Sequence, residues 1–163
     1  MKTTELSIDQ IRIDGGTQPR VKIDEQVAAE YAELYSSGVD LPPLTVFFDG
    51  TAHWLADGFH RYFASKRIGR TAVSACVHEG TRRDAILHAV AANTTHGLRR
   101  SNEDKQKAVE MLLHDGQWSQ WSDRQIARQC GVSDRMVNKY RQALTAKVSQ
   151  STVRRTATRL MPA

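Results

Sequence analysis

Hydrophobic and polar positions change spacing along the first half of the chain, from strand-like to helical and back. Residues 5–13 alternate roughly, which predicts a strand. Asp49-Gly50 separates two apolar runs, and because this pair suits the positive φ angles of a tight turn, we expect a hairpin there. The whole pattern predicts a small mixed sheet with helices, formed by strands at 5–13, 44–48, 52–55 and 72–77 and helices at 24–37 and 58–67.

Apolar positions in the second half have helical spacing only. Four residues that commonly cap helices precede its apolar stretches: Thr81, Ser101, Ser122 and Ser133. The helices that they begin are expected to end near residues 93, 114, 130 and 146. The sequence therefore predicts an α+β chain. Its expected parts are a mixed-sheet domain (1–96), an all-α helix-turn-helix domain (97–146) and a basic tail (147–163).

Residues 121–141 have the spacing of a helix-turn-helix. Ala127 is small where two helices must approach closely, and Gly131 follows four residues later at the turn, where a positive φ is easiest for glycine. Apolar side chains at regular spacing supply a shared core: Ile126, Val132, Val137 and Tyr140. This pattern is typical of a unit whose second helix enters the major groove of DNA.

One polar face of that second helix carries the side chains that we expect to contact DNA. Asparagine and glutamine can bond adenine, and arginine and lysine can bond guanine. Together with the helix N-terminus and one residue of the preceding helix, the predicted DNA-binding set is Arg124, Ser133, Asp134, Arg135, Asn138, Lys139 and Gln142. The alternative is a three-helix bundle whose outer face is only solvated.

Charge is divided unevenly along the chain. The formal net charge is +5, yet residues 1–60 hold four basic and ten acidic residues, a net of −6. Residues 121–163 hold nine basic and two acidic residues, a net of +7. Because lysine and arginine neutralise the phosphates of DNA, this distribution favours a nucleic-acid partner for the second half.

Composition argues against several other classes of protein. Cys76 and Cys130 are isolated, and the six histidines lack metal-ligand spacing, which argues against a disulfide framework and a zinc site. No run approaches the roughly 18 apolar residues of a transmembrane helix, and no signal peptide is apparent. We therefore expect a cytoplasmic protein.

Residues 56–66 place a glycine where a predicted strand meets a predicted helix. Gly58 allows a ligand to approach the backbone, and the helix N-terminus leaves amide donors free for an anion. Arg61 and His60 add cationic donors suited to phosphate oxygens. Asp57 is expected to cap the helix. The alternative interpretation pairs Arg61 with a carboxylate and packs Tyr62 inside.

Several motifs occur in the order found in one family. Gly58-x-x-Arg61-x-x-Ala64 resembles the GxxRxxA box of ParB-type partition proteins and their ParB/sulfiredoxin-fold relatives. Gln18-Pro19-Arg20 resembles the upstream Q-P-R box of that family, and Pro43-Leu44-x-Val46 resembles its next segment. Residues 93–96 lie where the family has its E-N-x-Q-R motif. A helix-turn-helix follows, so the resemblance covers roughly residues 8–145.

The resemblance implies a CTP-binding switch domain joined to a DNA-binding domain, with Mg²⁺ as a further cofactor. The partners that it implies are double-stranded DNA, a nucleoside triphosphate, a second copy of the chain and a partner ATPase. The role that it implies is partition or transcriptional regulation, in association with a nucleoid or plasmid. Carried over by position, the nucleotide-binding residues are Arg20, Gly58, Phe59, His60, Arg61, Ala64, Asn93, Thr94, Thr95 and His96. Ala92 stands where the family has an acidic residue, so we expect weak CTP hydrolysis at most.

Two other interpretations of the first half stay open. One is a protein-interaction module without nucleotide turnover, and the other is a nucleotide-using enzyme of the same fold. A sulfiredoxin-like reaction needs a thiolate where this chain has Phe59. A kinase-like reaction needs a carboxylate base near the phosphates. Asp57, which directly precedes Gly58, is a single acid at that position.

Overall fold

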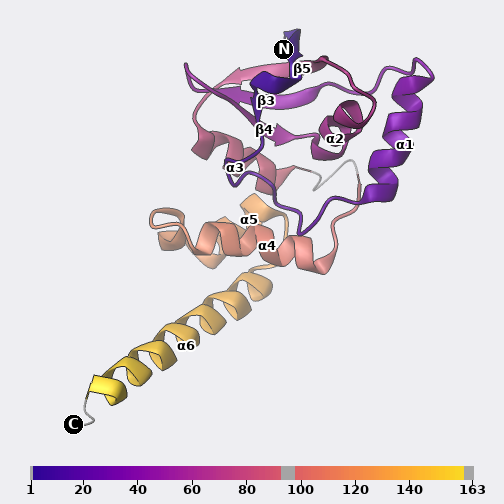
Figure 1. The fold of residues 1–163 in the computed structure, drawn as a ribbon. Coiled ribbons are helices and arrows are strands. Elements are labelled where there is room, and N and C mark those ends of the chain that lie inside the picture. The colour runs from indigo at the N-terminus through magenta and orange to yellow at the C-terminus, as the bar shows by residue number, and fades with distance from the viewer. Residues whose placement is uncertain (1, 93–97, 160–163) are drawn as a thin grey trace.

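A computed structural model describes residues 2–92 and 98–159 of the chain, with side chains up to Ser151. Its first half is built on a five-stranded mixed sheet with the strand order β1-β5-β3-β4-β2 (Figure 1). The strands are β1 (Thr3–Ser7), β2 (Ile11–Arg12), β3 (Leu44–Phe48), β4 (His53–Asp57) and β5 (Ala72–Glu79). Strand β3 pairs antiparallel with β4 and parallel with β5. The predicted hairpin is therefore confirmed, with Gly50 at a φ of 95° in its turn.

Six α-helices accompany the sheet in the described residues, together with the short 3₁₀ helices η1 (Ile8–Gln10) and η2 (Trp118–Gln120). They are α1 (Glu25–Ser36), α2 (Phe59–Arg67), α3 (Arg82–Ala91), α4 (Asn102–Leu113), α5 (Asp123–Cys130) and α6 (Asp134–Arg159). Ser101 and Ser122 form reciprocal capping boxes, as their spacing predicts. The α+β class is confirmed. None of the described helices is long and apolar enough to cross a membrane.

Two predicted elements differ from the structure. The single strand expected at 5–13 is wrong, because η1 divides this segment into β1, which pairs with β5, and β2, which pairs with β4. Ile8 and Ile11 are both buried, a spacing of three that a straight strand cannot place on one face. The last helix, expected to end near 146, continues to Arg159 because no glycine or proline interrupts it.

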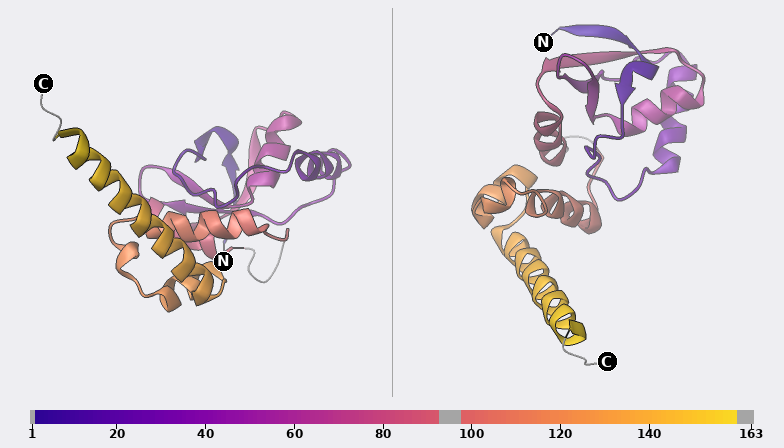
Figure 2. Two further views of the ribbon diagram at one scale, coloured as in Figure 1. Left: turned by 90° about the horizontal axis from the view of Figure 1, so that it is seen from below. Right: turned by 60° about the vertical axis from the view of Figure 1, so that its left-hand side comes forward.

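The buried apolar residues form two clusters. The first lies in the sheet and α2 and includes Leu44, Val46 and Leu55. The second lies in the helical half around Leu112, Ile126 and Val137, and it also takes in Ile86 and Val90 of α3. Helix α3 therefore lies between the sheet and the helices α4 and α5, whereas α6 projects away from the body of the molecule (Figures 1 and 2).

Candidate ligand cavity and nucleic-acid interface

A cavity of about 330 Å³ lies between the Gln18–Arg20 segment, helix α1, the start of α2 and the end of α3. This volume is within the range of about 300–1,000 Å³ that is usual for small-molecule sites. Of the predicted nucleotide-binding residues, the cavity brings together Arg20, Gly58, Phe59, His60 and Arg61. The walls also include residues that we did not predict: Tyr31, Leu41, Pro42, Ala56 and Ala89.

The remaining predicted residues have other positions. Ala64 is fully buried and does not line the cavity. Asn93, Thr94, Thr95 and His96 lie outside the described residues. Ala92 and Leu98 line the cavity from the two sides of that segment.

Gly58 occupies the start of α2 in a left-handed conformation, with a φ of 98°. It is the N-cap residue, so the expected cap by Asp57 is wrong. A Cβ atom at Gly58 would lie 2.5 Å from Cδ2 of Leu44 and 3.1 Å from Nη2 of Arg61. Glycine is therefore required at this position both by the backbone conformation and by the close packing against Leu44 and Arg61.

Arg61 points back toward the segment before β3 and toward the end of β4. Its Nη1 donates to the carbonyl oxygens of Pro42 and Pro43, the latter at 2.9 Å, and its Nη2 lies 3.1 Å from Oδ2 of Asp57. Tyr62 is 4% exposed. The guanidinium thus contacts protein acceptors at the cavity wall, which is the arrangement of the alternative interpretation.

His60 is buried at the boundary between the cavity and the loop before α1. Its Nε2 accepts a hydrogen bond from the backbone N–H of Asp24 at 3.0 Å. Burial lowers the pKa of His60 below its ordinary value, and the positive charge of Arg20 is the second cause of this shift. The imidazole therefore stays neutral at physiological pH and cannot supply a cation to a phosphate in this arrangement.

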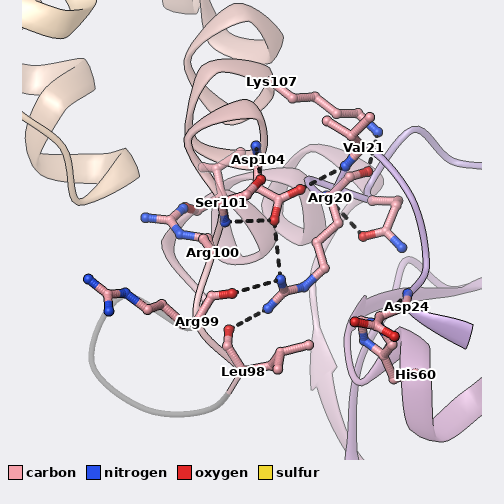
Figure 3. Close-up of polar contacts among 12 residues, drawn as sticks. Arg20, Val21, Asp24, His60, Leu98, Arg99, Arg100, Ser101, Asp104 and Lys107 are labelled. Atoms are coloured by element: carbon pink, nitrogen blue, oxygen red, sulfur yellow. Dashed lines mark hydrogen bonds and ion pairs between the residues drawn. The ribbon is translucent and has the colours of Figure 1, made fainter. Parts of the chain in front are cut away.

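Arg20 connects the cavity to helix α4 (Figure 3). Its Nη1 lies 3.3 Å from Oδ2 of Asp104, and its guanidinium also donates to the carbonyl oxygens of Leu98 and Arg99. Both members of the Arg20–Asp104 pair are buried. Sequence reasoning placed Arg20 at a phosphate and did not connect it with Asp104, which lies 84 residues away in the chain.

Asp104 accepts two further bonds, one across the same junction and one within the cap of α4. Its Oδ1 accepts from the backbone N–H of Val21 at 2.9 Å, and its Oδ2 accepts from that of Ser101 at 3.0 Å (Figure 3). Lys107 adds a bond of 2.7 Å to the carbonyl oxygen of Arg20. Burial acts to raise the pKa of Asp104, but the N–H donors and the charge of Arg20 outweigh it, so the pKa lies below its ordinary value.

Helices α5 and α6 meet at Gly131, which has a φ of 63° and caps the end of α5. Ile126 and Val137 are fully buried between them. The predicted DNA-binding residues, from Arg124 to Gln142, all lie exposed. A groove of about 490 Å³ on α6 is lined by five of them: Ser133, Arg135, Asn138, Lys139 and Gln142.

A hydrogen-bonded cluster joins α6 to the start of α5. Asp123 accepts from Nδ2 of Asn138 at 3.0 Å and from Nε of Arg141 at 2.6 Å. Arg141 also donates to the carbonyl oxygens of Ser119 and Trp121, at 2.7 Å each. Neither Asp123 nor Arg141 was predicted as a site residue, because each appears in the sequence as an ordinary charge on a helix.

Solved structures identify the class of fold. The C-terminally truncated chromosome-partitioning protein ParB from Caulobacter crescentus is similar in its complex with the centromeric parS site, with a TM-score of 0.56 and 18% identity over 86% of this chain and 71% of that chain. Its complex with CTP-γ-S is similar with a TM-score of 0.50 and 18% identity, over 89% and 79%. The chain has the ParB-type fold, which confirms the resemblance predicted from its motifs.

Comparison with known sequences indicates which proteins of this class the chain resembles. No family model matches the sequence. The chain is 37% identical over 121 residues to a Streptomyces griseus protein named "Streptomycin biosynthesis operon possible regulatory protein". It is 32% identical over 113 residues to "Transcriptional regulator NovG" of Streptomyces niveus. These matches cover 74% and 69% of this chain, and the chain spans about a third of the length of both relatives, 33% and 34%.

Proposed function

We propose that this chain is a sequence-specific DNA-binding transcriptional regulator of ParB-like type, with a sheet domain that binds CTP. The observation that carries the DNA-binding part is the exposed polar face of α6, held on a buried core by α5 and the turn at Gly131. The names of the two Streptomyces relatives favour regulation over partition. A homodimer and a partner ATPase stay predictions.

The chemistry of the α6 face supports base recognition over a purely solvated surface. Arg135, Asn138 and Lys139 project from the first two turns of the helix, the part that enters the major groove in helix-turn-helix proteins. Amide and guanidinium groups can distinguish bases, because their hydrogen-bond donors and acceptors match only certain base edges. A surface that serves only solubility does not require such groups. The ParB neighbour crystallised with parS has the same fold.

Arg135→Ala is expected to weaken binding to a preferred DNA site by about 1–3 kcal/mol and to relax selectivity at one base position. The preferred site is first obtained by in vitro selection with the wild-type chain, and affinities are then measured by fluorescence anisotropy at fixed salt. Arg12→Ala removes an exposed arginine from β2 and serves as the control, with no expected change. Selection that enriches no sequence would contradict the proposal.

The CTP part of the proposal rests on the cavity. Its lining holds Arg20 and Arg61 beside the open N-terminus of α2, where backbone N–H groups are available to an anion. The ParB structure with CTP-γ-S is a neighbour of the same fold. Since both arginines already contact protein acceptors, a triphosphate must replace some of these contacts when it binds.

The described residues do not form a protein-held Mg²⁺ site. Asp57 is the one carboxylate among the residues that line the cavity, and it is paired with Arg61. No group of three or more His, Cys, Asp or Glu side chains within residues 2–92 and 98–159 is arranged to hold a metal. We therefore assign no hydrolytic step to this cavity.

Arg61→Ala is expected to reduce CTP affinity at least tenfold, because a guanidinium supplies charge-assisted bonds to phosphate. Calorimetric titration of the wild type with CTP, ATP and GTP tests the nucleotide preference. Arg67→Ala, at the exposed end of the same helix, is the control and should bind as the wild type does. Arg61→Lys and a thermal melt separate lost binding from lost folding, since Arg61 also braces the segment before β3.

The alternative is that the sheet domain is a protein-interaction module. The observation that favours it is that the guanidinium groups of Arg20 and Arg61 are already bonded to carbonyl and carboxylate oxygens. Wild-type protein that binds none of the three nucleotides in the titration would support this alternative and leave the DNA-binding proposal untouched.

A further inference from the structure

We propose that Asp123 is a specificity-determining positioning residue, which orients the amide of Asn138 toward one kind of base. This inference rests on the proposed function, in which α6 reads DNA. Asp123 is the first residue of α5 and lies 15 positions before Asn138, so the contact joins the two helices of the unit.

The cluster around Asp123 is firmly held. One carboxylate oxygen accepts from Nε of Arg141 at 2.6 Å, and the other accepts from Nδ2 of Asn138 at 3.0 Å. Arg141 is itself tied to the carbonyl oxygens of Ser119 and Trp121. The Asp123 side chain is 25% exposed, so it belongs to the junction of the helices rather than to open solvent.

The chemistry of the contact fixes which end of the amide faces Asp123. An ionised carboxylate only accepts hydrogen bonds, so the NH₂ group of Asn138 must face it and the amide oxygen must lie at the other end. The bonds from Asn138 and Arg141 outweigh burial and lower the pKa of Asp123 below its ordinary value, which keeps the group ionised. Without this partner, the terminal torsion of an exposed asparagine is broad.

A fixed amide has a base preference. Its oxygen can accept from the amino group that adenine and cytosine present in the major groove, whereas guanine and thymine present acceptors there. The second hydrogen of the NH₂ group is left to donate to N7, which lies beside the amino group in adenine alone. The geometry therefore points to adenine as the base that Asn138 selects.

Charge supports a specific role for Asp123. A carboxylate beside DNA repels phosphates, and residues 121–163 contain only two acids, Asp123 and Asp134. Arg141 offsets the charge of Asp123, and their ion pair adds a polar contact between α5 and α6 to the apolar core that these helices share. Because Asn138 is exposed, its hydrogen bond to Asp123 adds no buried contact. The contribution of this bond is therefore to orient the Asn138 amide.

The experiment compares base preference in the wild type, Asp123→Ala, Asn138→Ala and the double variant. In vitro selection with the wild-type chain supplies the site, and competition anisotropy measures affinity for each base at each position. Asp123→Ala is expected to lower the preference for adenine about tenfold, at the same single position that Asn138→Ala relaxes. The double variant should lose little more than either single variant, because the two residues act as a unit.

Glu103→Ala is the matched control, since it also removes one negative charge from the exposed first turn of a helix, here α4, and lies outside the predicted DNA-binding set. It should leave base preference unchanged. Asp123→Asn, which keeps an acceptor oxygen, should retain more of the preference than Asp123→Ala, and thermal melts check that each variant folds. An unchanged preference in Asp123→Ala would overturn this inference alone, whereas a wild type without sequence preference would overturn the proposed function and the inference together.

Discussion

Asp104→Ala is expected to lower the free energy of unfolding by about 3–5 kcal/mol, because it leaves the buried guanidinium of Arg20 without its counter-charge. The substitution also removes the acceptor for the N–H groups of Val21 and Ser101. The bond from Val21 joins the segment beside the cavity to the first turn of α4, 83 residues away, and the bond from Ser101 belongs to the capping box of α4. Urea unfolding followed by circular dichroism measures the change.

Glu103→Ala is the control, because Glu103 is the exposed acid beside Asp104 in the same first turn. It removes the same charge from the helix N-terminus and should cost less than about 1 kcal/mol. The difference between wild type and Asp104→Ala should also depend on pH. Since folding lowers the pKa of Asp104, its contribution is complete above about pH 4 and is lost as the pH falls through the folded-state value. A cost for Asp104→Ala no larger than that for Glu103→Ala would contradict this account.

Local signals predicted much of the fold because neighbouring residues supply most of the information. The Ser122–Gln125 capping box, the Gly131 turn and the hairpin at Asp49-Gly50 each depend on a few adjacent positions, and each is present. The strand at 5–13 failed for the opposite reason. Its two parts, β1 and β2, lie at opposite edges of the sheet beside β5 and β4, and periodicity alone does not identify these partners.

The candidate site, too, was predicted where neighbouring residues supply the information and missed where distant residues do. The ordered motifs predicted that Arg20 and Arg61 would come together, and both line one cavity. The sequence did not predict their acceptors, because Asp104 lies 84 residues from Arg20 and its place in a capping box already explained it. Asp123 was missed similarly, since an acid in the first turn of a helix is common without any contact to a neighbouring helix.

Gly58→Ala is expected to cost about 2–4 kcal/mol, as it combines two separate penalties. The left-handed backbone at a φ of 98° costs a residue with a side chain about 1–3 kcal/mol. The added Cβ would also lie 2.5 Å from Cδ2 of Leu44, which is 1% exposed and belongs to the core of the sheet domain. Because the same Cβ would lie 3.1 Å from Arg61, nucleotide affinity should fall together with stability.

Gly69→Ala separates these two penalties. Gly69 follows the other end of α2 with a φ of 74°, and a Cβ there would point into open space. Gly69→Ala is therefore expected to lower the free energy of unfolding by about 1 kcal/mol, from backbone strain alone, and to leave nucleotide affinity unchanged. Equal losses of stability in the two variants would show that strain at a positive φ explains Gly58 by itself. A larger loss at Gly58, with weaker CTP binding, would show that close packing against Leu44 and Arg61 is what makes glycine necessary at the mouth of the cavity.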